Sequence, residues 1–281
     1  MATNTHSDTR PAGPDIASYL DLIQYDGQRQ PTLAVLHDLH VKHTRSIPFE
    51  NLSPFTGMAV DLGIDALMNK FTKQKRGGYC YEQNSLFQYV LQEIGFTVQG
   101  LAARVRLNAP DDVLTPRSHM LLLVEAEGET FIADTGFGGL TLTAPIRLVC
   151  DVVQDTPHGP YRLLRIGDDF CLQTKAKQAW QDLYIFDLVK HYPPDYEVFN
   201  WYTSTHPTSH FVNNLVAARP AKTGRHALFN RQYSFYHLDG RAEKKLLSSV
   251  AEIKDVLENE FRIRTSEVPE LDARLSAMLA T

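Results

Sequence analysis

The chain has 281 residues, of which 43% are hydrophobic and 22% charged, as is typical of a globular protein. Its formal net charge is −5 and its cations form no stripe, which argues against a nucleic-acid binder. No apolar run is long enough to span a membrane, and the polar residues 1–14 suggest a loose tail, not a signal peptide. Three cysteines, an odd and sparse number, indicate a reducing compartment, so we expect a cytoplasmic protein.

Helical periodicity dominates the first 96 residues. Asp15 follows a proline and can cap a short helix, and Thr32 can cap a longer one that ends before Pro48. Apolar side chains recur at helical spacing in two further segments. The predicted helices cover 15–23, 33–47, 64–75 and 81–94.

The pattern then changes to short runs of strand-forming residues, separated by clusters of Gly, Pro and Asp. These runs predict a sheet or small barrel between residues 97 and 203. Its expected strands are 97–107, 118–125, 130–134, 161–166 and 170–174.

The last section of the chain carries mixed signals. Strands are expected within 228–237, followed by an Asp-Gly turn at 239–240. The amphipathic segment 244–261 is predicted to form one helix, and Ser266 is predicted to open a final helix.

One cysteine stands where a helix begins. Gly77 and Gly78 lead into Cys80, and the helix expected at 81–94 follows at once and is stopped by Gly95. The partial positive charge at a helix N-terminus favours the thiolate, which is the nucleophilic form of cysteine. The two glycines would let the backbone or carbonyl of another molecule come close. From these residues alone, a catalytic cysteine and a buried structural one are equally open.

A histidine and an aspartate belong to one predicted hairpin, formed by the strands 118–125 and 130–134. An even-length loop centred after Glu127 places His119 and Asp134 on one face as diagonal neighbours, whereas an odd-length loop separates them. A cysteine nucleophile needs such a base and such an orienting group. The alternatives are a core histidine and an aspartate that bonds its own turn.

Five sequence features carry a family resemblance. They are Ile47–Leu52 (IPFENL), Arg76–Asn84 (RGGYCYEQN), His119, Asp134–Gly139 (DTGFGG) and Ser204–Phe211 (STHPTSHF). Together they make the chain resemble an arylamine N-acetyltransferase from about Tyr19 to the C-terminus. Thr135, Tyr81 and Gln83 replace the valine, phenylalanine and leucine common in that family. These departures concern substrate preference, because none removes a candidate catalytic group.

The resemblance implies an α+β, multi-domain fold. The family combines an N-terminal helical bundle, a central β-barrel and a C-terminal α/β lid around a cysteine-protease-like Cys-His-Asp core. The expected domains are 1–96 with the nucleophile, 97–203 with the histidine and aspartate, and 204–281 as the lid.

The resemblance also implies the chemistry. Cys80 would be the nucleophile, His119 the general base, and Asp134 the group that orients the imidazole. Acetyl-CoA would acetylate Cys80, and an arylamine, arylhydrazine or N-hydroxyarylamine would then take the acetyl group in a ping-pong reaction. No metal is expected, and helix packing with solvation explains the histidines at 37, 40 and 43.

Supporting roles follow from the same resemblance. Phe137 and Gly138 would line the aromatic acceptor pocket, although Phe137 also fits a core aromatic after a strand. Glu50 and Arg76 would form a buried pair beneath the nucleophile loop, with Asn51 completing it.

Two loops are candidates for holding coenzyme A. Thr115, Ser118 and Ser209 offer hydroxyl groups to its phosphates or its pantetheine amides. Two solvated loops without a ligand are an equally open explanation.

Two other enzyme classes share a Cys-His-Asp arrangement. An amide synthase of a natural-product pathway would take its acyl group from a carrier-bound chain. A cysteine hydrolase or transglutaminase-like enzyme differs in the acceptor that resolves the acyl enzyme, which the triad geometry does not fix.

Overall fold

Helices fill the first third of the chain, as the periodicity predicts. The computed structural model describes residues 13–110, 112–176 and 179–280, so most of the tail expected at 1–14 lies outside the described residues. The Thr32 hydroxyl accepts a hydrogen bond from the Val35 N–H at 3.3 Å, which confirms the predicted helix cap. The helices are α1 (Ala17–Leu22), α2 (Leu33–Ser46), α3 (Leu52–Phe55), α4 (Ile64–Met68), the π-helical turn η1 (Asn69–Lys73) and α5 (Cys80–Ile94).

Helix α5 lies at the centre of the N-terminal core. It begins at Cys80, and Gly95 ends it with a left-handed backbone of φ 105°. The carboxylate of Glu82 accepts the N–H of Tyr79 at 3.0 Å and so satisfies one free donor of the first turn. Both ends of this helix agree with the prediction.

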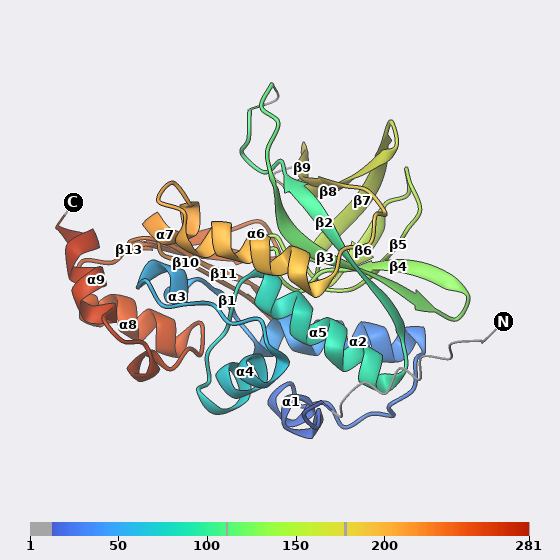
Figure 1. Cartoon of the computed structure of the whole chain (residues 1–281). Coiled ribbons are helices and arrows are strands. Elements are labelled where there is room, and N and C mark those ends of the chain that lie inside the picture. The colour runs from blue at the N-terminus through green and yellow to red at the C-terminus, as the bar shows by residue number, and fades with distance from the viewer. Residues whose placement is uncertain (1–12, 111, 177–178, 281) are drawn as a thin grey trace.

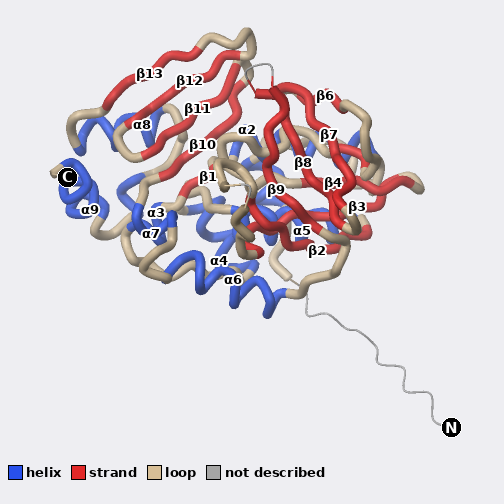
Figure 2. The backbone as a smooth tube through the Cα atoms, turned by 90° about the horizontal axis from the view of Figure 1, so that it is seen from above, coloured by secondary structure: helices blue, strands red, loops and turns tan. Residues whose placement is uncertain are grey.

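An eight-stranded antiparallel sheet follows and curves into a near-closed barrel (Figure 1 and Figure 2). Its strand order is β5-β4-β3-β2-β9-β8-β7-β6. The strands are β2 (Thr97–Val105), β3 (Arg117–Ala126), β4 (Glu129–Ala133), β5 (Ile146–Arg147), β6 (Gln154–Thr156), β7 (Gly159–Ile166), β8 (Asp169–Ala176) and β9 (Ala179–Phe186). The Gln154 side chain joins the two edges, because it bonds the N–H of Arg147 at 2.7 Å and its carbonyl at 3.0 Å.

The hairpin of β3 and β4 has the register of an even-length loop. Ala133 pairs with Leu122, and Ile132 pairs with Leu123. This confirms the prediction that residues 119 and 134 share one face of the hairpin.

A second sheet has the order β1-β10-β11-β12-β13, and its first strand comes from the N-terminal section. Its strands are β1 (Phe49–Glu50), β10 (Val216–Ala221), β11 (Gly224–Phe229), β12 (Gln232–His237) and β13 (Ala242–Leu246). The single helix predicted for 244–261 is therefore wrong at its start. Helix α8 (Val250–Asn259) begins after Ser249, whose hydroxyl accepts the Glu252 N–H at 3.2 Å, while the residues before it pair with β12.

The final helix is present as α9 (Leu271–Leu279), but Ser266 does not open it, because Ser266 lies in the separate short helix η2 (Thr265–Glu267). Besides α3, the sequence does not predict the helices α6 (Pro193–Thr205) and α7 (His210–Asn213). Helix α6 lies across the molecule between the barrel and the second sheet, and it runs through the expected boundary at 203/204 (Figure 1). The division into three domains stays a prediction. Within the described ranges, no helix combines the length and apolarity needed to cross a bilayer.

Candidate active site

Cys80 is the first residue of α5, and its sulfur lies 3.8 Å from the carbonyl oxygen of Ser118 in β3. Only 4% of Cys80 is exposed. Glu82, which caps this helix, is itself held by an ion pair with Lys70 at 2.5 Å. The positive end of a well-capped helix therefore meets a buried thiol.

Glycines allow two close backbone approaches around the nucleophile. A Cβ on Gly136 would lie 2.7 Å from the Cα of Cys80, so only glycine lets the hairpin end reach α5. A Cβ on Gly77 would lie 2.0 Å from the carbonyl oxygen of Pro48. The space beside Gly77 is thus filled by the chain itself, which corrects the expectation that another molecule approaches there.

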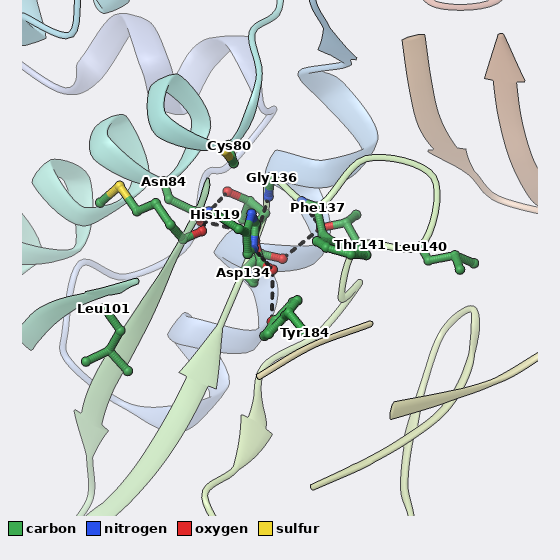
Figure 3. Close-up of polar contacts among 12 residues, drawn as sticks. Cys80, Asn84, Leu101, His119, Asp134, Gly136, Phe137, Leu140, Thr141 and Tyr184 are labelled. Atoms are coloured by element: carbon green, nitrogen blue, oxygen red, sulfur yellow. Dashed lines mark hydrogen bonds and ion pairs between the residues drawn. The ribbon is translucent and has the colours of Figure 1, made fainter. Parts of the chain in front are cut away.

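His119 and Asp134 meet beside Cys80 (Figure 3). The imidazole Nε2 lies 2.8 Å from the Oδ2 of Asp134, which leaves Nδ1 for the thiol. Burial alone would lower the pKa of His119, but the Asp134 carboxylate and the Cys80 side chain outweigh it and raise that pKa. The imidazole is therefore stabilised in its charged form.

Four donors surround the Asp134 carboxylate. Oδ1 accepts the Gly136 N–H at 2.9 Å and the Asn84 amide at 3.0 Å. Oδ2 accepts the Tyr184 hydroxyl at 3.0 Å as well as His119. Burial would raise the pKa of this carboxyl, but His119 and the hydrogen bonds hold it below its ordinary value. A carboxylate that stays charged fixes the tautomer of the imidazole.

The sequence analysis does not identify Asn84 or Tyr184. Asn84 lies one turn after Cys80 on α5, so helical spacing is a signal that points to it. Its amide also donates to the Met120 carbonyl at 2.7 Å, and its oxygen accepts the Thr135 N–H at 3.0 Å. Tyr184 comes from β9, a strand with no local signal that relates it to the site.

Two histidines of α2 lie behind the site. His40 Nε2 accepts the backbone N–H of Asp134 at 3.1 Å, and His43 bonds the Tyr19 hydroxyl at 2.7 Å and the Gln83 side chain at 2.6 Å. Both are fully buried, and burial lowers their pKa values to about 3 and about 4. Solvation therefore explains neither of them. Among the described residues no group of His, Cys, Asp and Glu could hold a metal ion.

Protonation of His43 gives a testable pH dependence. Its pKa is about 4 in the folded protein and near its ordinary 6.5 in the unfolded chain, so its contribution to stability is present above pH 6.5 and lost as pH falls. We expect His43→Gln, which keeps a donor and an acceptor, to flatten the slope of unfolding free energy between about pH 6 and 4.5. The change should be about 1 kcal/mol per pH unit, measured by urea denaturation. An unchanged slope would contradict the assignment, and His37→Gln on the exposed side of α2 is the control.

Phe137 packs against the histidine. Its ring centroid lies 5.0 Å from that of His119 and 5.1 Å from that of Tyr184. Gly138 follows with φ 85°, and a Cβ there would lie 3.6 Å from the Phe49 ring. Phe137 therefore stands beside the reacting groups, and the roles of Phe137 and Gly138 in acceptor binding stay predictions.

Comparison with known proteins identifies the family. A sequence profile described as N-acetyltransferase matches residues 32–268. The arylamine N-acetyltransferase of Mycolicibacterium smegmatis is 42% identical over 273 residues, which are 95% of this chain and 99% of the relative. The chain belongs to the arylamine N-acetyltransferase family. The prediction of an acetyltransferase enzyme is confirmed with it.

Two further arylamine N-acetyltransferases extend the comparison. A Salmonella typhimurium relative, named arylamine N-acetyltransferase / N-hydroxyarylamine O-acetyltransferase, is 39% identical over 89% of this chain and 90% of its own. The solved structure of the Mycobacterium marinum enzyme in complex with CoA matches with a TM-score of 0.90 at 43% identity. The match covers 94% of this chain and 98% of that one. The mixed helix-and-sheet fold is therefore that of arylamine N-acetyltransferases.

The pair expected beneath the nucleophile loop is present. Arg76 Nε lies 2.8 Å from Glu50 Oε1, and the two side chains are 1% and 0% exposed. Glu50 Oε2 also accepts the Leu52 N–H at 2.6 Å. Burial would raise the pKa of Glu50, but Arg76 and Lys70 outweigh burial and hold it below its ordinary value.

Asn51 does not complete that pair, which corrects the expectation. Its amide group donates to the carbonyls of Phe211 at 2.7 Å and Asn214 at 2.6 Å, and its oxygen accepts the Val216 N–H at 2.7 Å. Asn51 thus satisfies three backbone groups between α7 and β10. It ties the N-terminal section to the second sheet.

The three residues predicted to contact coenzyme A differ in how their hydroxyls are used. The Thr115 hydroxyl donates to the Val105 carbonyl at 2.8 Å. The hydroxyl of Ser209, which stands at the start of α7, donates to the Thr203 carbonyl in α6. The Ser118 hydroxyl forms no hydrogen bond to another described residue. The backbone carbonyl of Ser118 contacts the sulfur of Cys80. Ser118 is therefore the most available of the three, and all three contacts stay predictions.

Proposed function

We propose that this chain transfers an acetyl group from acetyl-CoA to arylamines, arylhydrazines and N-hydroxyarylamines through an acetyl-Cys80 intermediate. The observation that carries the proposal is the placement of Cys80 at the start of α5, beside the hydrogen-bonded His119 and Asp134. The CoA complex of the Mycobacterium marinum relative supports the donor, and the names of the relatives support the acceptors.

In the first half-reaction, His119 holds the proton of Cys80 on Nδ1, and the resulting thiolate attacks the thioester carbonyl. The tetrahedral oxyanion receives a hydrogen bond from the backbone N–H of Cys80 at the helix start. Collapse breaks the bond to the sulfur of coenzyme A, which leaves with the proton from His119. One thioester replaces another, so this step is nearly balanced in free energy.

In the second half-reaction, an aromatic amine enters against Phe137 and its nitrogen attacks the carbonyl of acetyl-Cys80. A weakly basic aromatic amine is neutral near pH 7, so it attacks without first losing a proton. His119 then takes the proton from the attacking nitrogen and returns it to the sulfur as the C–S bond breaks. Residues 204–281 act as a lid that keeps water away, so an amine resolves the acyl enzyme.

The hydroxyl-bearing residues Thr115, Ser118 and Ser209 bind the donor, acetyl-CoA. Ser118 is placed best, because its hydroxyl is uncommitted and its backbone lies against the nucleophile. Thr115 and Ser209 contribute as hydrogen-bond acceptors, since their hydroxyl protons are directed to backbone carbonyls.

The test is an intact-mass measurement after incubation with acetyl-CoA in the absence of an amine. Wild-type protein should gain one acetyl group, and a later addition of an arylamine should remove it. The variant Cys80→Ala should gain none. Cys150→Ala removes a half-buried cysteine away from the site and is the matched control, which should be acetylated like the wild type.

Wild-type protein that stays unacetylated, while Cys80 still reacts with a thiol reagent, would rule out acetyl-CoA as the donor. Acyl groups on carrier proteins would then be tested as donors. An acetyl-enzyme that water discharges as fast as any amine would instead indicate a hydrolase.

A further inference from the structure

The loop that carries Phe137 is organised by Thr141. The Thr141 hydroxyl donates to the Asp134 carbonyl at 2.9 Å and accepts the Phe137 N–H at 3.2 Å (Figure 3). The Thr141 N–H closes the turn on the Gly138 carbonyl at 3.1 Å. One side chain therefore sets the path of the backbone between the aspartate and the phenylalanine.

Thr141 is itself held by a cation from the second sheet. Arg225, on β11, donates through Nη1 to the carbonyls of Thr141 at 3.1 Å and Gly139 at 3.3 Å. Its Nη2 donates to the Tyr161 hydroxyl at 3.0 Å, and that hydroxyl donates in turn to the carbonyls of Thr141 and Leu140. Arg225 and Tyr161 thus form a clamp, which holds the end of the loop at residues 139–141 from two different sheets.

The guanidinium of Arg225 is a buried charge in an unusual environment. Arg225 is 8% exposed, and no carboxylate among the described residues forms an ion pair with it. A buried cation that is held only by neutral oxygens costs desolvation free energy and needs well-placed acceptors. Every acceptor of Arg225 belongs either to the loop or to Tyr161, which bonds the loop.

We propose that Arg225 is a positioning residue that fixes Phe137 for the acceptor half-reaction and thereby sets the preference for aromatic amines. This inference rests on the proposed function, because it assigns an aromatic acceptor to the surface of Phe137. It links the C-terminal sheet to acceptor choice through Thr141.

The clamp acts on Phe137 more than on Asp134. The Asp134 carboxylate keeps its four donors, and its N–H stays bonded to His40 when the loop loosens. The backbone N–H of Phe137 has the Thr141 hydroxyl as its one hydrogen-bond partner in the described part of the chain. Loss of the clamp therefore displaces the phenylalanine and leaves the Cys-His-Asp group in place.

The experiment measures the two half-reactions separately in wild type and Arg225→Lys. Lysine keeps the charge but cannot bond two loop carbonyls and Tyr161 from one planar group. The acetyl-enzyme is prepared with p-nitrophenyl acetate and challenged with either aniline or hydrazine. We expect the second-order rate with aniline to fall about tenfold and the rates of acetylation and of transfer to hydrazine to change less than about twofold.

A matched control perturbs the interface between the barrel and the second sheet at a residue that does not bond the loop. His158, in the turn between β6 and β7, bonds the carbonyls of Ala221 at 2.7 Å and Gly224 at 3.1 Å, so it joins the barrel to the second sheet beside Arg225 but makes no hydrogen bond to the loop. His158→Gln should leave the ratio of aniline to hydrazine rates unchanged. If it lowers that ratio as Arg225→Lys does, general loosening of the interface explains the effect and the proposal is overturned.

A second variant covers the case in which Arg225→Lys does not fold. Tyr161→Phe removes the hydroxyl that bonds both Arg225 and the loop carbonyls, and it should lower the same ratio about three- to tenfold. Equal losses with aniline and hydrazine in the folded variant would overturn the proposal while the proposed function stands. Wild-type acetyl-enzyme that passes its acetyl group to neither amine would refute the proposed function, and this inference with it.

Discussion

Replacing Asp134 by asparagine should lower kcat/KM for acetyl transfer by roughly 10⁴-fold. The Asp134 carboxylate accepts the Nε2–H of His119 at 2.8 Å, which directs Nδ1 to the thiol so that it can take and hold the thiol proton. An asparagine amide can donate to Nε2 instead, and the ring proton then moves to Nδ1. The imidazole would present a donor to Cys80 where the reaction needs an acceptor.

The rate of acetylation of Cys80 by acetyl-CoA, followed by intact mass, measures this loss directly. Tyr184→Phe is the matched control, because it removes a hydroxyl that bonds the same carboxylate oxygen at 3.0 Å but leaves the charge in place. Its loss should be about ten- to hundredfold, as for one hydrogen bond to a charged group. An Asp134→Asn protein that keeps a tenth of the wild-type rate would refute the role assigned to Asp134.

The same substitution has a signature in stability at alkaline pH. The pKa of folded His119 is raised above its ordinary 6.5, so its contribution to stability is full below pH 6.5 and is lost as pH rises through the folded value. Without the carboxylate, burial opposes the charged imidazole with less compensation. Asp134→Asn should therefore show a weaker decline of unfolding free energy between about pH 7 and 9, which also verifies that the variant is folded.

Local patterns predict the parts of the site that depend on near neighbours in the sequence. Glycine and capping signals place both ends of α5, and hence Cys80 at its start. Loop parity alone decides that His119 and Asp134 share a face of their hairpin, because side chains alternate along a strand. These features need no knowledge of the tertiary fold.

Contacts between distant segments have no comparable signal. Tyr184 and Arg225 reach the site from β9 and β11, and nothing near either residue in the sequence indicates which loop it will meet. The segment 244–261 shows the same limit, since its first residues suit a helix but pair as an edge strand with β12. Tertiary pairing overrides local propensity there.

Adjacency in the sequence also misleads at Asn51. It follows Glu50 directly, which favours a shared role, but β1 ends at Glu50, and Asn51 stands at the turn into α3. Glu50 therefore faces Arg76, whereas Asn51 faces the backbone between α7 and β10. The end of β1 thus gives two adjacent side chains different partners.

Breaking the buried pair should destabilise the protein more than any other single change considered above. Arg76→Met and Glu50→Gln should each lower the unfolding free energy by about 3–5 kcal/mol, because each strands one polar or charged partner in the core. The double variant should lose less than the sum of the two. Urea denaturation of the wild type, the two single variants and the double variant gives the free energies of a double-mutant cycle. Fully additive losses would show that the two side chains do not interact.

The pH dependence of the Arg76→Met loss identifies its cause. In the wild type, the folded pKa of Glu50 is below its ordinary 4.5, so the pair's contribution is present above that pH and is lost as pH falls. In Arg76→Met, burial acts on the carboxyl with only Lys70 and the Leu52 N–H to oppose it, so the pKa of Glu50 should rise and protonation should relieve the stranded charge. The deficit relative to wild type should therefore shrink between about pH 7 and 4. A deficit that stays constant over this range would mean that lost packing of the arginine stem, and not the uncompensated charge, causes the destabilisation.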